Sequence, residues 1–176
     1  AGGNEYGTIT ASYAMSMING NNCIGGLVGG NGCYGKIMTC YATGTVTGNK
    51  NVGGLVGYNV NSNWIEHCHG TIFSCYATGS VSGSEYVGGL VGGWGESGSP
   101  TIHECFWDVQ TSGLNNGVGN IDPDPSGVTG LSTMMMKIPS TFKDAGWNFD
   151  QDWWMPHGNY PRLGWDKGYS NGSGTE

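Results

Sequence analysis

The densest group of side chains that could do chemistry is Glu66-His67-Cys68-His69, with His103 further along the chain. Imidazole, thiolate and carboxylate groups are the ligands that zinc and related metals prefer. This region is expected to be extended, however, and adjacent residues of a strand point to opposite faces. His67 and His69 could share a site, but Cys68 points to the opposite face and could not easily join them. We therefore expect neither a metal site nor a cofactor.

A second pattern, His103-Glu104, begins like the His-Glu-x-x-His motif of zinc proteases. Trp107 stands where the second histidine would be, and the segment reads as a strand rather than a helix. This departure argues against a peptidase.

Paired carboxylates cleave glycosidic bonds, and many parallel β-helices process polysaccharides. The acids that could serve are Glu66, Glu85, Glu104 and Asp108. They recur in no pattern that places two of them at a set spacing on one face, so we interpret them as solvated surface acids. The segment Asp122-Pro-Asp-Pro-Ser126 has too few oxygens for calcium and reads as a rigid acidic loop. The chain is therefore predicted not to be an enzyme.

Four aromatic residues, Tyr34, Tyr58, Trp64 and Trp94, lie in segments that follow a repeated Gly-Leu-Val-Gly sequence. In stacked repeats such segments project from one edge and often form the binding face. Exposed rings can stack on sugars, since each has an apolar body and a polar tip. They can also cover the edge or contact a neighbouring chain, and this interpretation is favoured over sugar binding.

Two sequence blocks alternate along the chain and place these residues. The first, x-Gly-Gly-Leu-Val-Gly, occupies residues 24–29, 52–57 and 87–92. The second occupies residues 37–48, 72–83 and 102–107, with a half copy at 9–20. Each unit holds short β-type runs between glycines and cannot bury its apolar side chains alone, whereas stacked units can. The sequence predicts an all-β fold, a right-handed parallel β-helix of about three to four coils.

Stacking in register predicts columns of equivalent residues. The columns are Ile9/Ile37/Ile72/Ile102, Ser12/Cys40/Cys75/Cys105, Ala14/Ala42/Ala77, Ile24/Val52/Val87 and Leu27/Leu55/Leu90. Most of them should face the core. Strand alternation cannot place both Leu27 and Val28 inside, so either the Leu or the Val column lies outside or sits at a bend, and the pattern leaves this open.

The blocks Gly-Gly-Leu-Val-Gly and Cys-Tyr-Ala-Thr-Gly-x-Val-x-Gly resemble the GLUG-motif repeat family. The resemblance implies a bacterial or archaeal surface protein or adhesin; such repeats also precede the protease domain of immunoglobulin A1 proteases. It carries no catalytic residue into this chain. The sequence that follows resembles the module that commonly ends such arrays. We expect repeats at 1–108, a C-terminal capping module at 109–166 and a Gly/Ser-rich tail at 167–176.

The capping module is expected to contain a short helix at Thr133–Lys137, which Pro139 ends. A brief turn at 141–145 and closing strands at 150–155 and 160–163 should follow it. Four tryptophans are expected to cover the open end of the solenoid, which repeat proteins need for solubility: Trp147, Trp153, Trp154 and Trp165.

The cysteines fall into two groups. Cys33 and Cys68 each lie four residues before an aligned isoleucine and so share a column in consecutive coils. Neighbouring coils set their Cα atoms about 5 Å apart, which predicts a Cys33–Cys68 disulfide. The inward column of Cys40, Cys75 and Cys105 is predicted to stay as free thiols that pack as small apolar side chains.

Composition narrows the function and location. A net charge of −7 with only six Lys and Arg argues against a nucleic-acid partner. No apolar run approaches the roughly 18 residues of a membrane span, and no basic-then-apolar leader precedes the repeats, so we expect a mature product or an excised piece. Six cysteines without a Cys-x-x-Cys pair favour an extracellular or cell-surface location.

These features predict a non-enzymatic structural or adhesive module of a prokaryotic surface protein. Residues 9–20 match the second block without a first block before them, so the first coil is incomplete. Unpaired strand edges there predict head-to-tail self-association into a filament, or neighbouring repeats of a longer chain. The alternative is a carbohydrate-binding or carbohydrate-processing domain that uses the aromatic loops. Its partner would be a glycan; a host or cell-surface protein would suit the adhesive role.

Overall fold

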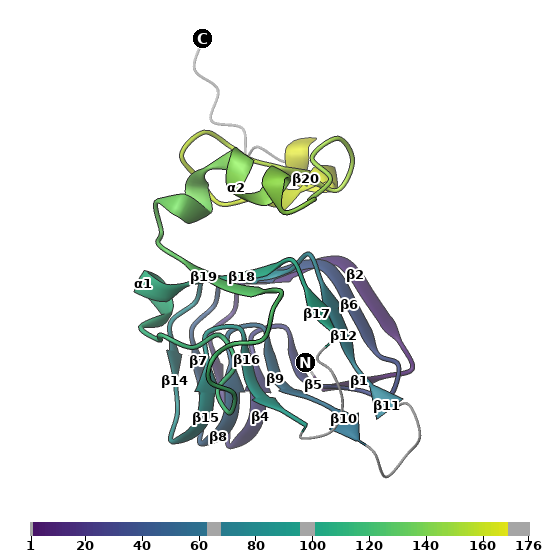
Figure 1. The fold of residues 1–176 in the computed structure, drawn as a ribbon, viewed down its shortest axis with the longest axis vertical. Coiled ribbons are helices and arrows are strands. Elements are labelled where there is room, and N and C mark those ends of the chain that lie inside the picture. Colours follow the sequence, from purple (N-terminus) through teal and green to yellow (C-terminus); the bar gives the residue numbers. More distant parts are fainter. Residues whose placement is uncertain (1, 63–67, 96–100, 169–176) are drawn as a thin grey trace.

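The computed structural model describes residues 2–62, 68–95 and 101–168. Short strands of successive repeats pair in parallel and form four sheets, which the chain visits in the same order each time (Figure 1). We call one such passage a coil. Sheet A contains β1 (Gly3–Glu5), β5 (Val28–Gly32), β9 (Val56–Asn59) and β16 (Val91–Trp94).

Sheet B is the longest of the four. It contains β2 (Thr8–Ala14), β6 (Lys36–Ala42), β12 (Thr71–Phe73), β13 (Tyr76–Ala77), β17 (Ile102–His103), β18 (Cys105–Asp108) and β19 (Val128–Leu131). Sheet C contains β3 (Ile18–Asn19), β7 (Val46–Thr47) and β14 (Val81–Ser82). Sheet D contains β4 (Asn22–Gly25), β8 (Lys50–Gly53) and β15 (Glu85–Gly88). The predicted parallel stacking is therefore confirmed.

The register agrees with the predicted columns. In sheet B, Ile37 pairs with Ile9 and with Ile72, and Ile72 pairs with Ile102. Val52 pairs with Ile24 and with Val87 in sheet D, and Ala42 joins Ala14 to Ala77 in sheet B. These side chains form the core between the sheets.

The corner between sheets D and A shows which of the Leu and Val columns faces the core. Leu27 lies in the bend after β4, while Val28 begins β5, and both side chains are buried. Leu55 and Val56, and Leu90 and Val91, repeat this arrangement. Strand alternation stops at the bend, so both columns face the core.

The paired glycines before each Leu-Val make this corner narrow. A Cβ atom on Gly53 would collide with the Val56 carbonyl oxygen, and one on Gly54 would collide with the Gly89 carbonyl oxygen of the next coil. The corner thus needs glycine because backbone of the same and the adjacent coil fills the space a side chain would take.

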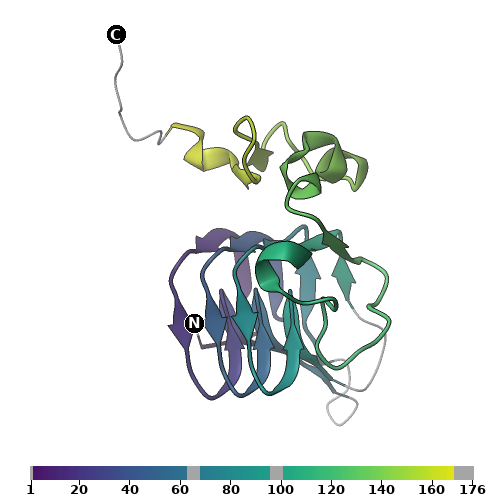
Figure 2. The same ribbon diagram turned by 90° about the vertical axis from the view of Figure 1, so that its left-hand side faces the viewer.

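The two ends of the stack differ (Figure 2). At the C-terminal end, the carbonyl of Asn116 accepts a hydrogen bond from the Gly89 N–H, and the Gly117 carbonyl accepts from Leu90 and Val91. β19 then pairs with β18, so the segment from Gly113 to Gly127 leads into a further strand of sheet B. This segment covers the C-terminal end.

The tryptophans therefore do not cover the end as predicted. Trp147 and Trp153 pack on the outer face of sheet B, against Tyr41, Tyr76 and Phe106. Figure 1 shows the C-terminal module (residues 132–168) lying along the side of the stack, over β18, β6 and β2. The outward rings of sheet B explain the difference, since Tyr41, Tyr76 and Phe106 offer the apolar surface on which these tryptophans pack.

The elements of the C-terminal module also differ in part from expectation. The expected helix is a single 3-10 turn, Met135–Lys137, and Pro139 begins α2 (Pro139–Asp144) instead of only ending the preceding turn. Proline suits the first helical position because its missing N–H would have no intrahelical partner there. The closing strands are the antiparallel pair β20 (Trp153–Trp154) and β21 (Arg162–Leu163), followed by a 3-10 helix, Gly164–Gly168.

Two smaller elements complete the fold. Helix α1 (Val109–Ser112) follows β18 directly, and Asp108 caps its N-terminus. The strands β10 (Asn61–Ser62) and β11 (Cys68–His69) form an antiparallel pair beside the stack.

Candidate functional site

The first coil is an uncovered face of the stack. β1, β2, β3 and β4 are the edge strands of sheets A, B, C and D, and no described residue pairs with their outer edges. Large apolar side chains of the first coil are exposed, including Tyr6, Tyr13, Met15 and Met17. Met17 is 84% exposed. The equivalent positions of the next two coils are also exposed, but they carry the polar residues Thr45 and Ser80. We call this surface, formed by β1–β4, the first-coil face.

An asparagine column runs through the core beside sheet A. Asn4 Nδ2 donates to Asn31 Oδ1 at 2.9 Å, and Asn31 Nδ2 donates to Asn59 Oδ1 at 2.8 Å. The last amide donates to the Gly70 carbonyl at 2.9 Å. Buried amides cost free energy unless they are bonded, and here each one satisfies the next. No described group donates to Asn4 Oδ1, so the column ends at the first-coil face.

A tyrosine column lies on the outer face of sheet B. The rings of Tyr13, Tyr41 and Tyr76 stack at successive centroid distances of 5.0 Å with interplanar angles of 7° and 10°. Tyr160 of the C-terminal module continues the stack beyond Tyr76, at 6.3 Å and 17°. Parallel pairing places these residues in line, and the offset stacking of their rings adds attraction beyond simple burial.

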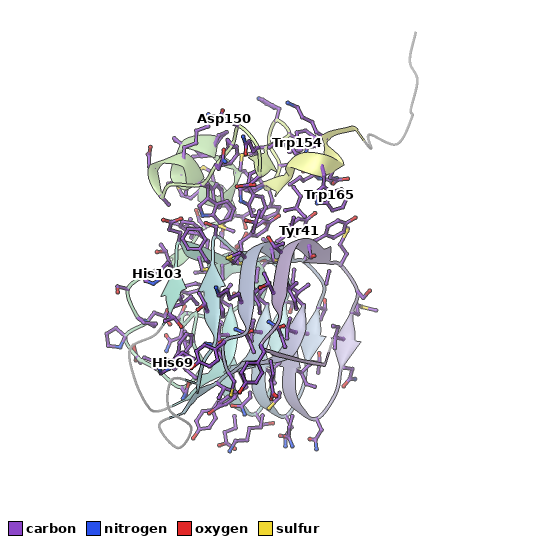
Figure 3. All side chains as sticks on the ribbon, turned by 90° about the vertical axis from the view of Figure 1, so that its right-hand side faces the viewer. Tyr41, His69, His103, Asp150, Trp154 and Trp165 are labelled. Atoms are coloured by element: carbon purple, nitrogen blue, oxygen red, sulfur yellow. The ribbon has the colours of Figure 1, made fainter. Side chains whose placement is uncertain are left out.

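A cavity of about 550 Å³ opens between this tyrosine column and the C-terminal module. Tyr13, Met15, Tyr41, Thr43 and Tyr76 line its wall on sheet B. The opposite wall consists of Asn159, Tyr160, Pro161, Arg162, Trp165 and Asp166. In Figure 3, Tyr41 and Trp165 face this space from the two sides. We call it the side cavity.

The side cavity combines rings with polar groups. Trp165 is 53% exposed, and its Nε1–H donates to the Ala11 carbonyl at 3.0 Å, which holds the indole against Tyr13. Arg162 and Asp166 form an ion pair at 3.5 Å beside it. Burial raises the pKa of Tyr41 to about 12, so its phenol is protonated at neutral pH.

Asp108 joins the stack to the C-terminal module. Its Oδ1 accepts hydrogen bonds from the backbone N–H groups of Gln110 and Thr111, at 2.9 and 3.1 Å. Its Oδ2 accepts from the hydroxyls of Thr133 and Tyr160, both at 2.7 Å. The prediction that Asp108 is a solvated surface acid is wrong, because the residue is fully buried.

The environment of Asp108 sets its ionisation. Burial acts to raise the pKa of this carboxyl, but the hydrogen bonds from Thr133, Tyr160 and two backbone amides favour the charged form more strongly, so the pKa is lowered. Tyr160 shows the complementary effect: burial and its bond to Asp108 raise its pKa to about 12. The pair is thus a carboxylate and a neutral phenol at neutral pH.

The four predicted aromatic ligands do not form one exposed line. Tyr34 is exposed and tilts against Tyr6 at 5.8 Å, while Tyr58 is half-buried. Trp94 is only 3% exposed, and Asn120 bonds to both its backbone N–H and its carbonyl. Trp64 lies outside the described residues. Trp94 is buried because it stands at the end of the asparagine column, where it fills the core instead of the edge.

The predicted metal ligands and acids lie apart. His69 and His103 are separated in Figure 3, and no three His, Cys, Asp or Glu side chains converge within residues 2–62, 68–95 and 101–168. Glu66 and His67 lie outside the described residues. Glu85 forms an exposed ion pair with Lys50 at 2.6 Å, and Glu104 accepts a hydrogen bond from Ser74 at 3.1 Å.

The Asp122–Ser126 segment has a structural use. Asp124 accepts hydrogen bonds from the backbone N–H groups of Gly117 and Val118, at 2.7 and 2.8 Å. This carboxylate therefore fixes the segment that covers the C-terminal end of the stack.

The inward cysteine column agrees with prediction. Cys40, Cys75 and Cys105 are buried free thiols. Burial is the main reason that the pKa of Cys75 is raised, and the Cys75 side chain raises the pKa of Cys40, so both stay protonated. The predicted Cys33–Cys68 bond stays a prediction, since the Cys68 side chain lies outside the described residues.

Comparison with known proteins identifies a known motif in two of the repeats. Residues 20–47 and 48–82 each match the GLUG motif, and each match spans one coil. A stretch of 63 residues is 38% identical to a protein of Evansella cellulosilytica named as a Gly-rich membrane protein. That stretch covers 36% of this chain and 6% of the relative. No solved structure matches the chain.

Proposed function

Because the chain carries two GLUG motifs, we propose that it is a non-enzymatic structural or adhesive module of a prokaryotic surface protein, located outside the cell. The core of this module is a right-handed parallel β-helix, and the C-terminal module braces it from the side. The stack itself extends past residue 108 to β19, since β19 pairs with β18. The chain covers a small part of its relative, so the activity of any larger protein is a separate question.

The absence of an enzymatic function is supported by what the acidic side chains do. Asp108 and Asp124 hold backbone and hydroxyl groups in place, and Glu85 pairs with Lys50. Catalytic acids need a cleft and a partner at a set distance. Among the described acids, each of these three has a structural or surface role.

The main support for the structural role is the contrast between the two ends of the stack. Residues 113–127 cover the core at the C-terminal end and leave β19 as the last strand of sheet B, whereas the first-coil face has four edge strands whose outer side pairs with no described strand. Proteins normally pair, twist or cover such edges because they recruit other strands. The first-coil face is thus a surface suited to another strand assembly.

The chemistry of the first-coil face matches a further coil of the same kind. Asn4 Oδ1 can accept one more amide, as Asn31 and Asn59 do from their neighbours. Half-buried Ile9 and Ile24 offer apolar columns that the next coils already use. We infer that the partner is a second copy of this chain, whose β19 is the opposite edge strand of sheet B. Head-to-tail contact of this type does not close and builds a filament.

Sedimentation velocity over a concentration series tests this association. We expect species larger than a monomer, and Met17→Glu should dissociate them by placing a charge on the first-coil face. Met134→Glu is the matched control, because Met134 is equally an exposed methionine but belongs to the C-terminal module. A monomer at every concentration would leave a neighbouring repeat of a longer chain as the partner and would refute self-association.

An extracellular location is supported by the cysteines. The Tyr34 N–H donates to the His69 carbonyl at 3.0 Å, so the residues next to Cys33 and Cys68 lie side by side in adjacent coils. A disulfide there requires an oxidising compartment. No helix in the described part of the chain is long and apolar enough to span a bilayer.

A further inference from the structure

We propose that the side cavity binds a short, neutral saccharide. The proposal goes beyond the structural role, and it differs from the loop site predicted from the sequence, because its rings come from sheet B and the C-terminal module. The volume of about 550 Å³ lies within the usual range for ligand sites, which is roughly 300–1,000 Å³. The cavity is preformed, since both of its walls belong to packed elements.

The two exposed rings supply the apolar part of the site. Trp165 and Tyr13 stack at 5.9 Å with an angle of 20°, and both keep exposed surface. The hydrogen bond from Trp165 Nε1 to Ala11 fixes the indole without burying it. A ring held in this way can stack on the apolar face of a sugar at little cost in conformational freedom.

Several polar groups around the rings suit hydroxyl ligands. No hydrogen-bond partner is found among the described residues for the Thr43 hydroxyl or for that of Tyr41, and both residues line the cavity. A protonated phenol and an alcohol can each donate and accept, as sugar hydroxyls do. A purely apolar ligand would displace the water from these hydroxyls and would offer no hydrogen bonds in its place.

The charges favour a neutral ligand. Arg162 and Asp166 face each other at 3.5 Å, so neither sign dominates the cavity. The chain as a whole carries −7, which disfavours an acidic sugar at long range. Neutral hexoses and N-acetylhexosamines meet both conditions.

The test uses the whole chain on an array of neutral hexose and N-acetylhexosamine oligosaccharides of two to four units, followed by calorimetry with the best ligand. We expect Trp165→Ala to weaken binding about tenfold, because the stacking surface is lost. Trp165→Phe keeps a ring and should retain most of the affinity. Thr43→Val changes no described hydrogen bond within the protein and should weaken binding about fivefold.

Tyr34→Ala is the matched control, since Tyr34 is an exposed aromatic outside the side cavity. Affinity unchanged in Tyr34→Ala but reduced in both Trp165→Ala and Thr43→Val supports the side cavity. Affinity lost in Tyr34→Ala but kept in Trp165→Ala places the site on the loops and overturns the proposal. No binding across the array also overturns it, and leaves the sedimentation test of self-association unaffected.

Discussion

Replacing Asp108 by Asn tests how the stack is tied to its C-terminal module. The substitution keeps the oxygen that caps helix α1 but removes the acceptor for the Thr133 and Tyr160 hydroxyls, which both lie at 2.7 Å. A hydrogen bond to a charged group contributes about 1.5–3 kcal/mol, and hydroxyls near the surface recover part of this from water. We therefore expect a loss of about 2 kcal/mol in the free energy of unfolding. Thermal unfolding should show a Tm lower by about 4–8 °C.

The pH dependence of this loss identifies its cause. The pKa of Asp108 is lowered in the folded state, so its contribution is present above the unfolded pKa of about 4 and is lost as the pH falls through the folded pKa. The stability gap between the unmodified protein and Asp108→Asn should be constant near pH 7 and shrink below about pH 4. Asp150→Asn removes the same charge from an exposed residue of the C-terminal module and should change little (Figure 3). A gap that persists unchanged at pH 2, or an equal loss in both variants, would refute this reasoning.

Other outcomes follow from the same structure. Asn59→Ala breaks the asparagine column and should destabilise the fold by about 2–3 kcal/mol in chemical denaturation, whereas Asn49→Ala, at an exposed position, should be nearly neutral. Peptide mapping without reduction should recover a Cys33–Cys68 cross-link, and alkylation of both thiols would rule it out. The purified chain should not hydrolyse or eliminate common polysaccharides; turnover that Glu104→Gln abolishes would contradict the non-enzymatic assignment.

The repeat made most of the fold predictable. Identical residues at equal positions had to pair with one another, so the columns of isoleucine, alanine and cysteine followed from alignment alone. The burial of both Leu27 and Val28 did not follow, because alternation holds only within a strand, and Leu27 lies in the bend while Val28 begins the next strand. The paired glycines before each Leu-Val were the available signal for that bend.

The contacts between the outer face of sheet B and the C-terminal module were harder to predict from the sequence. The tyrosine column was visible as Tyr13, Tyr41 and Tyr76, but no local pattern tells which surface a separate module will cover. The asparagine column had a signal, since Asn4, Asn31 and Asn59 each stand two residues after a glycine of the repeat. Asp108 had none, because Thr133 and Tyr160 are distant in sequence and meet it only when the C-terminal module folds over sheet B.

Amide hydrogen exchange of the whole chain at low and high concentration tests the central claim most directly, that the first-coil face is where this module joins a partner. Association through strand edges pairs the outward N–H groups of β1–β4 and slows their exchange. We predict protection of residues 3–25 that rises with concentration and is lost in Met17→Glu, while Met134→Glu behaves like the unmodified protein. Exchange in residues 3–25 that stays equally fast at every concentration would contradict the account.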